Sequence, residues 1–327
     1  MLNLFALFYL GLLTDNVTGL KATNDKIIGG TAAGIGQFPY FAQLSIGTKK
    51  INGTIMTTEC AGTLIEPSWI LTSAHCFSRA RYSVPSYMYT NNFVAAFMGS
   101  NMIYPFADRI AVRYIRRSYI HPNYRYTQVP SEEFFENDVA VARLNSPFIL
   151  SEFVTTIRLA EEKASLCNKG IIIGSGLEKK FTQDRTKHVE YVLIRPKTSD
   201  KISLKPRVRR RGVFYTEMKW SQGSPVAGDT GGPFVCYQRF KPIQYGIISD
   251  YYNNARTRTS ITQYEFVARY LSFILRVVPL NYAYQPKSKK ESKIGPLAPR
   301  PLTSASSQRS CDVYLLIIVV PFSVPYL

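Results

Sequence analysis

Four short segments of the chain carry the side chains that could perform chemistry. One holds a histidine, whose imidazole exchanges a proton near neutral pH. Another holds an aspartate, and the last holds a threonine hydroxyl, a group that serves as nucleophile in some enzymes. Taken singly, His75 could be a core histidine and Asp138 a turn residue. In chain order the segments are Ile27-Ile28-Gly29-Gly30, Thr72-Ser73-Ala74-His75-Cys76, Asn137-Asp138-Val139-Ala140 and Gly228-Asp229-Thr230-Gly231-Gly232-Pro233.

Taken together and in this order, the segments resemble the chymotrypsin/trypsin-like family of serine endopeptidases (peptidase S1), with its chain order of His, Asp and Ser. The resemblance runs over residues 27–278, most of the chain. It implies an all-β fold, in which two packed six-stranded antiparallel β-barrels hold the active site between them and a C-terminal α-helix follows. It also implies a protein or peptide substrate or binding partner, with no cofactor and no metal.

The resemblance assigns a role to each residue of the site. His75 is the general base, and Asp138 holds the other ring nitrogen and fixes the tautomer. Thr230 stands where the family has its nucleophilic serine. The backbone N–H groups of Gly228 and Thr230 would form the oxyanion hole, which depends on backbone geometry and survives a change of side chain.

The activation sequence of the family is present as well. Cleavage after Lys26 would free the amine of Ile27. By resemblance, this amine enters the protein and pairs with Asp229, because a buried charge needs a partner. Residues 20–26 are therefore predicted to be a short activation propeptide.

The predicted substrate pocket departs from the family pattern. Ser224 stands at the pocket base, where a trypsin has aspartate, so cleavage after Lys or Arg is not expected. Tyr251 and Thr262 replace wall-forming glycines and would narrow the pocket. Beside Ser249, also assigned to the pocket, Asp250 replaces an apolar residue.

The threonine at position 230 leaves two hypotheses open. Its methyl group stiffens χ1 and takes up space beside the imidazole, and a misplacement of ~1 Å can cost about a hundredfold in rate. The favoured hypothesis is a secreted homologue with little or no proteolytic activity that acts by binding. The alternative is an active endopeptidase with a threonine nucleophile and non-tryptic specificity.

The elements that would position these residues are mostly strands. Short apolar runs separated by Gly, Pro, Asn and Ser are typical of an all-β fold. The exception is the segment from Gln263 to Val278, whose apolar residues recur at helical spacing before Pro279 ends the pattern. Its predicted apolar face comprises Phe266, Val267, Tyr270, Leu271, Ile274 and Leu275. The clearest strand-like runs are Tyr40 to Ile46, Ala61 to Ile65, Val139 to Leu144, Gly170 to Ile173 and Ile243 to Ile248.

The N-terminus is predicted to direct secretion. Residues 1–19 begin with an apolar run that is too short to span a bilayer and end in small residues, as a signal peptide does. A secreted chain would also make Asn52, in Asn52-Gly53-Thr54, a glycosylation site.

Secretion into an oxidising compartment predicts that most of the five cysteines pair. By resemblance to the family, Cys60 pairs with Cys76 and Cys167 pairs with Cys236. Cys311 is left over.

The C-terminal residues change in composition. Residues 279–310 are rich in Pro, Lys and Ser and predict a disordered linker. Residues 311–327 form an apolar tail that contains two prolines and is too short for a membrane span. Small residues upstream of the tail suggest instead a signal for a glycolipid (GPI) anchor.

The chain is strongly basic, with a net charge of +18. Such a surface is attracted to anionic partners, although a soluble basic exterior is the favoured explanation of the charge. The densest cluster, Lys205 to Arg211, is a candidate site for an anionic surface or polysaccharide, a processing site for a convertase that cleaves at basic residues, or a solvated loop. No nucleic-acid partner is expected, because motifs for that function are missing.

Overall fold

The structure is a computed structural model of the chain. It divides the chain into two units, Met1–Pro286 and Lys287–Leu327, and every described residue belongs to the first unit. The predicted signal peptide, propeptide, glycosylation site, basic cluster and apolar tail lie outside the described residues. Among the residues described, no helix is long and apolar enough to cross a membrane. The described residues are 30–50, 55–78, 89–103, 110–129, 132–175, 187–202, 212–219, 224–226, 228–254 and 256–280.

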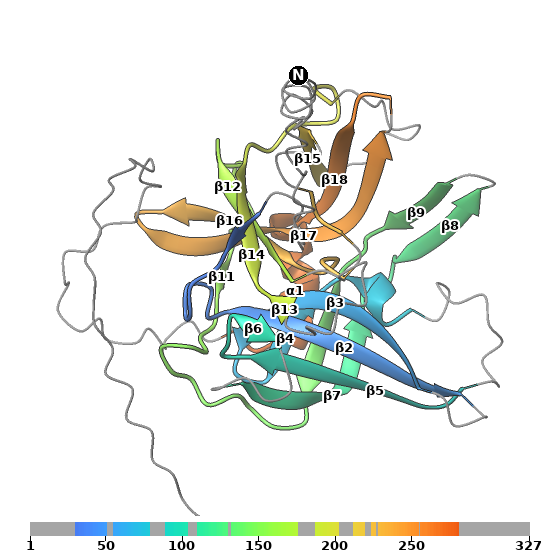
Figure 1. Cartoon of the computed structure of the whole chain (residues 1–327), viewed down its shortest axis with the longest axis vertical. Coiled ribbons are helices and arrows are strands. Elements are labelled where there is room, and N and C mark those ends of the chain that lie inside the picture. Colours follow the sequence, from blue (N-terminus) through green and yellow to red (C-terminus); the bar gives the residue numbers. More distant parts are fainter. Residues whose placement is uncertain are drawn as a thin grey trace, which may run out of the picture. The chain divides into compact units, whose positions relative to one another are not determined.

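The N-terminal half of the first unit forms a closed barrel of six antiparallel strands (Figure 1), in the order β10-β4-β3-β2-β5-β7. Leu44, Leu64 and Ile70 are fully buried in its core. The six-stranded barrel implied by the family resemblance is thus confirmed for this half. Its strands are β2 (Phe41–Lys50), β3 (Ile55–Glu66), β4 (Trp69–Thr72), β5 (Tyr89–Met98), β7 (Ala111–Ile120) and β10 (Ala140–Leu144).

The remaining half forms an eight-stranded sheet whose path runs β1-β14-β12-β16-β17-β18-β15. The two-residue strand β11 joins β17 in parallel, and the other pairs are antiparallel. Beyond β15, Lys197 and Tyr215 exchange two backbone hydrogen bonds of 2.6 and 2.9 Å. The strands are β1 (Thr31–Ala32), β11 (Arg158–Leu159), β12 (Gly170–Gly174), β14 (Glu190–Ile194), β15 (Val213–Lys219), β16 (Pro233–Gln238), β17 (Lys241–Asn254) and β18 (Thr259–Phe266).

Two small two-stranded sheets complete the strand inventory of the described residues. One pairs β6 (Met102–Ile103) with β13 (Lys187–His188). The other, drawn in green in Figure 1, pairs β8 (Arg125–Val129) with β9 (Glu132–Glu136). Strand β9 ends two residues before Asp138, so this pair lies next to a predicted site residue.

One apolar cluster joins the barrel to the sheet. Leu71 from β4 and Ile173 and Ile247 from β12 and β17 are fully buried in it. The junction also contains a buried polar contact, in which the Thr63 hydroxyl donates to the Gln244 side-chain oxygen at 2.6 Å. Such a contact fixes the relative placement of the two halves, because a buried polar group left unpaired is costly.

The C-terminal helix is present, but its predicted start and face are partly wrong. Residues 263–266 belong to β18, a 3-10 turn covers Val267–Tyr270, and helix α1 runs only from Leu271 to Val277. Because β18 is buried on both faces, its apolar residues do not distinguish strand from helix by periodicity. Leu275, predicted to be buried, is 56% exposed, and Phe273 is buried in its place.

Both predicted disulfides are confirmed. Cys60 on β3 is bonded to Cys76, and Cys167 is bonded to Cys236 on β16. The first closes the loop that carries His75, and the second joins positions that are 69 residues apart in the sequence.

Removal of the Cys167–Cys236 disulfide should destabilise the protein. The double variant Cys167→Ser, Cys236→Ser is expected to lower the free energy of unfolding by about 2–5 kcal/mol, because the unfolded chain is no longer cross-linked. Urea denaturation measures the change, and Cys311→Ser is the matched control with no predicted disulfide. Equal midpoints for the double variant and the wild type would contradict this expectation.

Candidate active site

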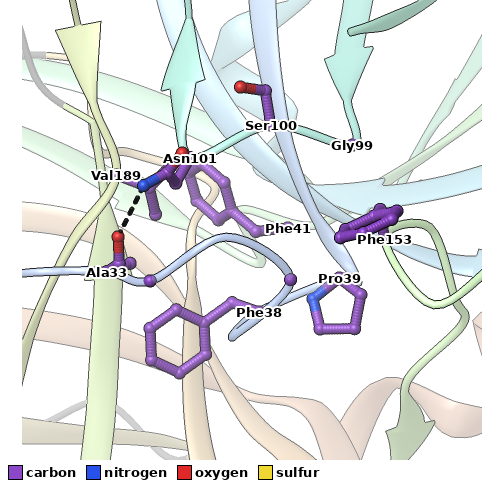
Figure 2. A pocket seen from close by; sticks show the side chains of 11 residues that line it. Ala33, Phe38, Pro39, Phe41, Gly99, Ser100, Asn101, Phe153 and Val189 are labelled. Carbon is purple, nitrogen blue, oxygen red and sulfur yellow. Dashed lines mark hydrogen bonds between the residues drawn. The ribbon is translucent and has the colours of Figure 1, made fainter. Parts of the chain in front are cut away.

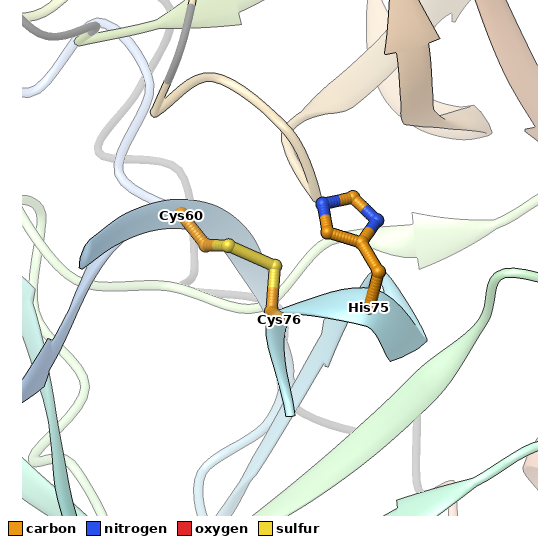
Figure 3. Close-up of side chains that lie close together, drawn as sticks. All are labelled: Cys60, His75 and Cys76. Atoms are coloured by element: carbon orange, nitrogen blue, oxygen red, sulfur yellow. A yellow bond between two sulfur atoms is a disulfide. The ribbon is translucent and has the colours of Figure 1, made fainter. Parts of the chain in front are cut away.

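His75 lies in a 3-10 turn, Ala74–Cys76, directly after the buried strand β4. The disulfide from Cys76 to Cys60 ties this turn to β3, and Figure 3 shows the imidazole beside the two sulfur atoms. The side chain of His75 is 1% exposed. The histidine is therefore held on the barrel by a strand on one side and a covalent bond on the other.

Asp138 meets His75 from the loop between β9 and β10. Its Oδ2 atom lies 2.7 Å from His75 Nδ1, and its Oδ1 atom accepts a 2.8 Å hydrogen bond from the backbone N–H of His75. Ser249 on β17 donates to Oδ2 at 2.8 Å. The preceding residue, Asn137, has a φ of 50°, a left-handed conformation that asparagine tolerates better than most residues. The structure thus brings the two predicted residues together as an oriented pair.

Thr230 lies in the turn before β16 but does not join this pair. Its carbonyl oxygen accepts a 2.8 Å hydrogen bond from the N–H of Ala61, and its hydroxyl lies 3.7 Å from the Sγ atom of Cys60. Within the part of the chain that the structure describes, the buried Nε2 atom of His75 has no hydrogen-bond partner. The Thr230 hydroxyl therefore faces the disulfide, and among the described residues no hydroxyl donates to Nε2 of His75.

Two glycines of the predicted oxyanion turn have positive φ angles. Gly228 has a φ of 99° and Gly231 a φ of 87°, values that favour glycine. A side chain at Gly231 would collide with the carbonyl oxygen of Ala61 and the hydroxyl of Thr72. The turn can therefore approach β3 and β4 closely only because position 231 has no Cβ atom.

Asp229 is fully buried beneath this turn. Its carboxylate accepts hydrogen bonds of 2.9 Å from the N–H groups of Ser175 and Val226. Gly174 gives it room, because a Cβ atom there would collide with the carboxylate. The predicted partner of this carboxylate, the Ile27 amine, lies outside the described residues, as does the cleavage position Lys26.

Three of the predicted pocket residues, Ser249, Tyr251 and Thr262, lie on the second sheet, and Ser224 lies in the segment between β15 and β16. Ser224 is buried and donates to the hydroxyl of Ser260 on β18 at 2.5 Å. Tyr251 on β17 faces Thr262 on β18 in register, and Thr262 is 1% exposed. The structure thus brings Tyr251 and Thr262 together, whereas the Ser249 hydroxyl is used by Asp138.

Sequence reasoning missed a second buried carboxyl group behind Asp138. Glu265 on β18 is 1% exposed and accepts from the backbone N–H of Asp138 at 3.3 Å. The hydroxyl of Tyr270 donates to its other oxygen. Burial and the neighbouring Glu265 raise the pKa of Tyr270 far above its usual value, so that Tyr270 stays a donor. The available signal was the position of Glu265 between the aromatic residues Tyr264 and Phe266, but the segment was assigned to a helix.

An aromatic ring that sequence reasoning also missed covers His75. Phe135 on β9 stacks on the imidazole, with ring centroids 4.6 Å apart and planes at 27°. Phe135 is itself 3% exposed and contacts Tyr126 on β8 at 5.5 Å between centroids. The β8–β9 pair therefore forms one wall of the site and shields the histidine from water.

Asp250, next to Ser249 on β17, is a further carboxyl group at the site. Its pKa is raised from 3.8 to about 6, mainly by burial and in smaller part by the charge of Asp138. Hydrogen bonds from Tyr251 and Tyr252 and the nearby His75 oppose this shift. The side chain of Asp250 is only partly buried, whereas the residues of β17 just before it are buried.

Two other features of the described residues offer no chemistry. Potential metal-binding atoms of Cys60, His75 and Cys76 lie within 4.8 Å of one another, but the two sulfur atoms are bonded together (Figure 3), which leaves one ligand. A second pocket, shown in Figure 2, is lined mainly by glycine and apolar residues. The side-chain amide of Asn101 in this pocket already donates to the Ala33 carbonyl at 2.8 Å.

Comparison with known proteins identifies relatives of the whole domain. The family described as Trypsin matches residues 27–274, more than half of the chain. Kallikrein 1-related peptidase b24 of Mus musculus is 22% identical over 240 residues, which is 71% of this chain and 83% of the relative. Urokinase-type plasminogen activator of Gallus gallus is 25% identical over 259 residues, 76% of this chain and 56% of that protein. The solved structure of HL collagenase has the same fold, with a TM-score of 0.60 at 22% identity, and the match covers 78% of this chain and 100% of that one.

Substitution of Gly231 should disrupt the turn that carries Thr230. The variant Gly231→Ala is expected to lower the free energy of unfolding by about 2–5 kcal/mol, because it adds both overpacking and an unfavourable φ. Gly34→Ala is the matched control, since a Cβ atom there meets only Gln37 at an ordinary 3.7 Å. Urea denaturation compares the two variants, and equal losses would contradict the close approach at Gly231.

Asp250→Asn should stabilise the protein at about pH 7.5 and have little effect near pH 4. The raised pKa means that the folded state holds the proton more tightly than the unfolded state. The wild type therefore loses stability as the pH rises from about 4 to about 6, and the neutral amide avoids this loss. We expect a gain of about 1–2 kcal/mol at the higher pH, since partial exposure screens the charge. Urea denaturation at both pH values measures it, and equal effects at the two values would disprove it.

Proposed function

Because the chain belongs to the trypsin family, we propose that it is a secreted protease homologue with little or no peptidase activity, which acts by binding a protein or peptide. The observation that carries the proposal is the direction of the Thr230 hydroxyl, which faces the Cys60 sulfur at 3.7 Å while His75 Nε2 has no partner. Covalent catalysis of this type needs the nucleophile and its base within hydrogen-bond reach.

The extra methyl group of Thr230 explains why the hydroxyl does not simply turn toward His75. Thr230 is 4% exposed, so its methyl must occupy protein space in every rotamer. Any rotation of the hydroxyl toward the base also moves the methyl to another staggered position within the same buried surroundings. A β-branched side chain has few alternatives at χ1. The near-attack geometry is therefore costly to reach.

The pocket supports the same proposal. Tyr251 and Thr262 face each other across β17 and β18, where the family resemblance assigns wall-forming glycines. Side chains at both positions reduce the space for a substrate side chain. Less binding energy is then available to hold a substrate in the reactive geometry. A ligand that binds along the outside of the cleft needs no such pocket.

A second candidate function, that of an active endopeptidase with a threonine nucleophile, is favoured by one observation. The His75–Asp138 pair has the geometry of a working base, with a 2.7 Å contact and a buried, fully oriented carboxylate. Threonine keeps the hydroxyl that the chemistry needs. Its specificity would be non-tryptic, since Ser224 and not an acid stands at the proposed pocket base.

The proposed extracellular location agrees with several features of the chain. Two disulfides, Cys60–Cys76 and Cys167–Cys236, are typical of proteins that fold in an oxidising compartment. We propose that residues 1–19 are removed as a signal peptide and that the apolar tail, residues 311–327, is a signal for a glycolipid anchor. The basic cluster Lys205 to Arg211 stays a predicted site for an anionic surface.

Kinetics of repaired variants test the proposed function. Protein cleaved after Lys26 is offered a mixed peptide library, and turnover is followed for the wild type, Thr230→Ser and the triple variant Thr230→Ser, Tyr251→Gly, Thr262→Gly. We expect Thr230→Ser to raise kcat/KM by about a hundredfold, because the hydroxyl can then reach His75. The triple variant should gain more, since both repairs serve one transition state.

Two controls make the kinetic result decisive. Adding His75→Ala to the triple variant should abolish the gain, which assigns it to this site. Titration with a reactive organophosphonate counts the competent sites in each preparation. If the wild type turns over peptides at ~1–1000 per second, the proposal is wrong and the protein is an enzyme with a threonine nucleophile.

A further inference from the structure

Asp250 lies where strand β17 passes the active site. Its neighbour Ser249 points into the core and donates to Asp138. Ser249 is fully buried, whereas Asp250 is only partly buried. The pairing register of β17 with β18 also shifts between Ile248 and Asp250, a local irregularity of the kind that re-aims side chains next to active sites.

The carboxylate of Asp250 has neutral donors but no cation. It accepts a 2.8 Å hydrogen bond from the N–H of Tyr251, and the side chain of Tyr252 donates to it as well. Of the described residues that act on it electrostatically, His75 and Asp138 are the charged or titratable ones, and no lysine or arginine is among them. Because the preceding residue, Ser249, donates to Asp138 at 2.8 Å, Asp250 lies next to the His75–Asp138 pair in the structure.

This arrangement is unfavourable for the isolated protein. A partly buried carboxylate loses hydration, and without a cation the loss is not offset. The rise in its pKa is the sign of that cost. A perturbed acid in a cleft is typical of a functional position, because a ligand can supply the missing charge. None of the lysines and arginines in the described ranges of the chain is among these partners.

We propose that Asp250 is a recognition residue of the cleft, which binds a lysine or arginine side chain of a peptide ligand beside His75. The inference rests on the proposed function, in which the cleft binds a peptide. It differs from recognition at the base of the pocket, where Ser224 and Ser260 hydrogen-bond to each other and offer no charge. Asp250 would therefore recognise a positively charged side chain of the peptide other than the one that enters the pocket.

Selection from a displayed library of short random peptides tests the proposal. The library is screened in parallel against the wild type, Asp250→Asn and the control Glu152→Gln, which removes an exposed carboxylate from the loop before Val154. We expect lysine and arginine to be enriched at one peptide position for the wild type and the control, but not for Asp250→Asn. The amide variant keeps the shape of the side chain and should fold at least as stably.

Affinities of one selected peptide complete the test. Its arginine form should bind the wild type at least about tenfold more tightly than its citrulline form, which lacks the charge, and Asp250→Asn should remove this difference. If the difference persists in Asp250→Asn, or if the wild type does not distinguish the two peptides, the assignment of Asp250 is wrong while peptide binding stands. If the wild type selects no peptide at all, the proposed binding function itself is overturned.

Discussion

The buried carboxylate of Asp138 is the interaction on which the rest of the site depends. It accepts hydrogen bonds from the backbone and the imidazole of His75 on the barrel and from Ser249 on the sheet. A fully buried carboxylate is tolerated only when its oxygens are satisfied in this way. The same contacts that stabilise the charge therefore hold the two halves of the domain together and orient the imidazole. Glu265 and Tyr270 extend the network behind Asp138 and tie it to the C-terminal helix.

This network is complete without Thr230. The turn of Thr230 is held by backbone hydrogen bonds, from Ala61 N–H to its carbonyl and from Gly231 N–H to the carbonyl of Ile248. The side chain at position 230 contributes nothing to either. These backbone hydrogen bonds and the contacts of the His75–Asp138 pair therefore do not involve the side chain at position 230. Structural integrity of the site and its chemical competence are separate properties in this protein.

The sequence predicted the parts of the molecule that depend on local motifs in a fixed order. The segments around His75 and Asp138 and the strand-rich domain follow from short patterns in the sequence, and the two disulfide pairings follow from the family resemblance that those segments carry. It did not predict where helix α1 begins, because a strand buried on both faces has no clear periodicity. Nor did it predict the direction of the Thr230 hydroxyl or the stacking of Phe135 on His75. Both depend on packing between segments that are distant in the chain.

The ends of the second sheet bear on the behaviour of the protein in concentrated solution. A closed barrel has no free strand edge, whereas an open sheet presents backbone groups that can pair with another chain. Here one end is the strand β1 of only two residues, Thr31–Ala32, and the other is β15, whose Tyr215 is engaged in two hydrogen bonds by Lys197. Lys219 and Glu217 add charge to the same strand. Short, blocked and charged edges resist the strand-to-strand association that leads to aggregates, so this mostly β protein can remain monomeric where an uninterrupted edge would promote fibril growth.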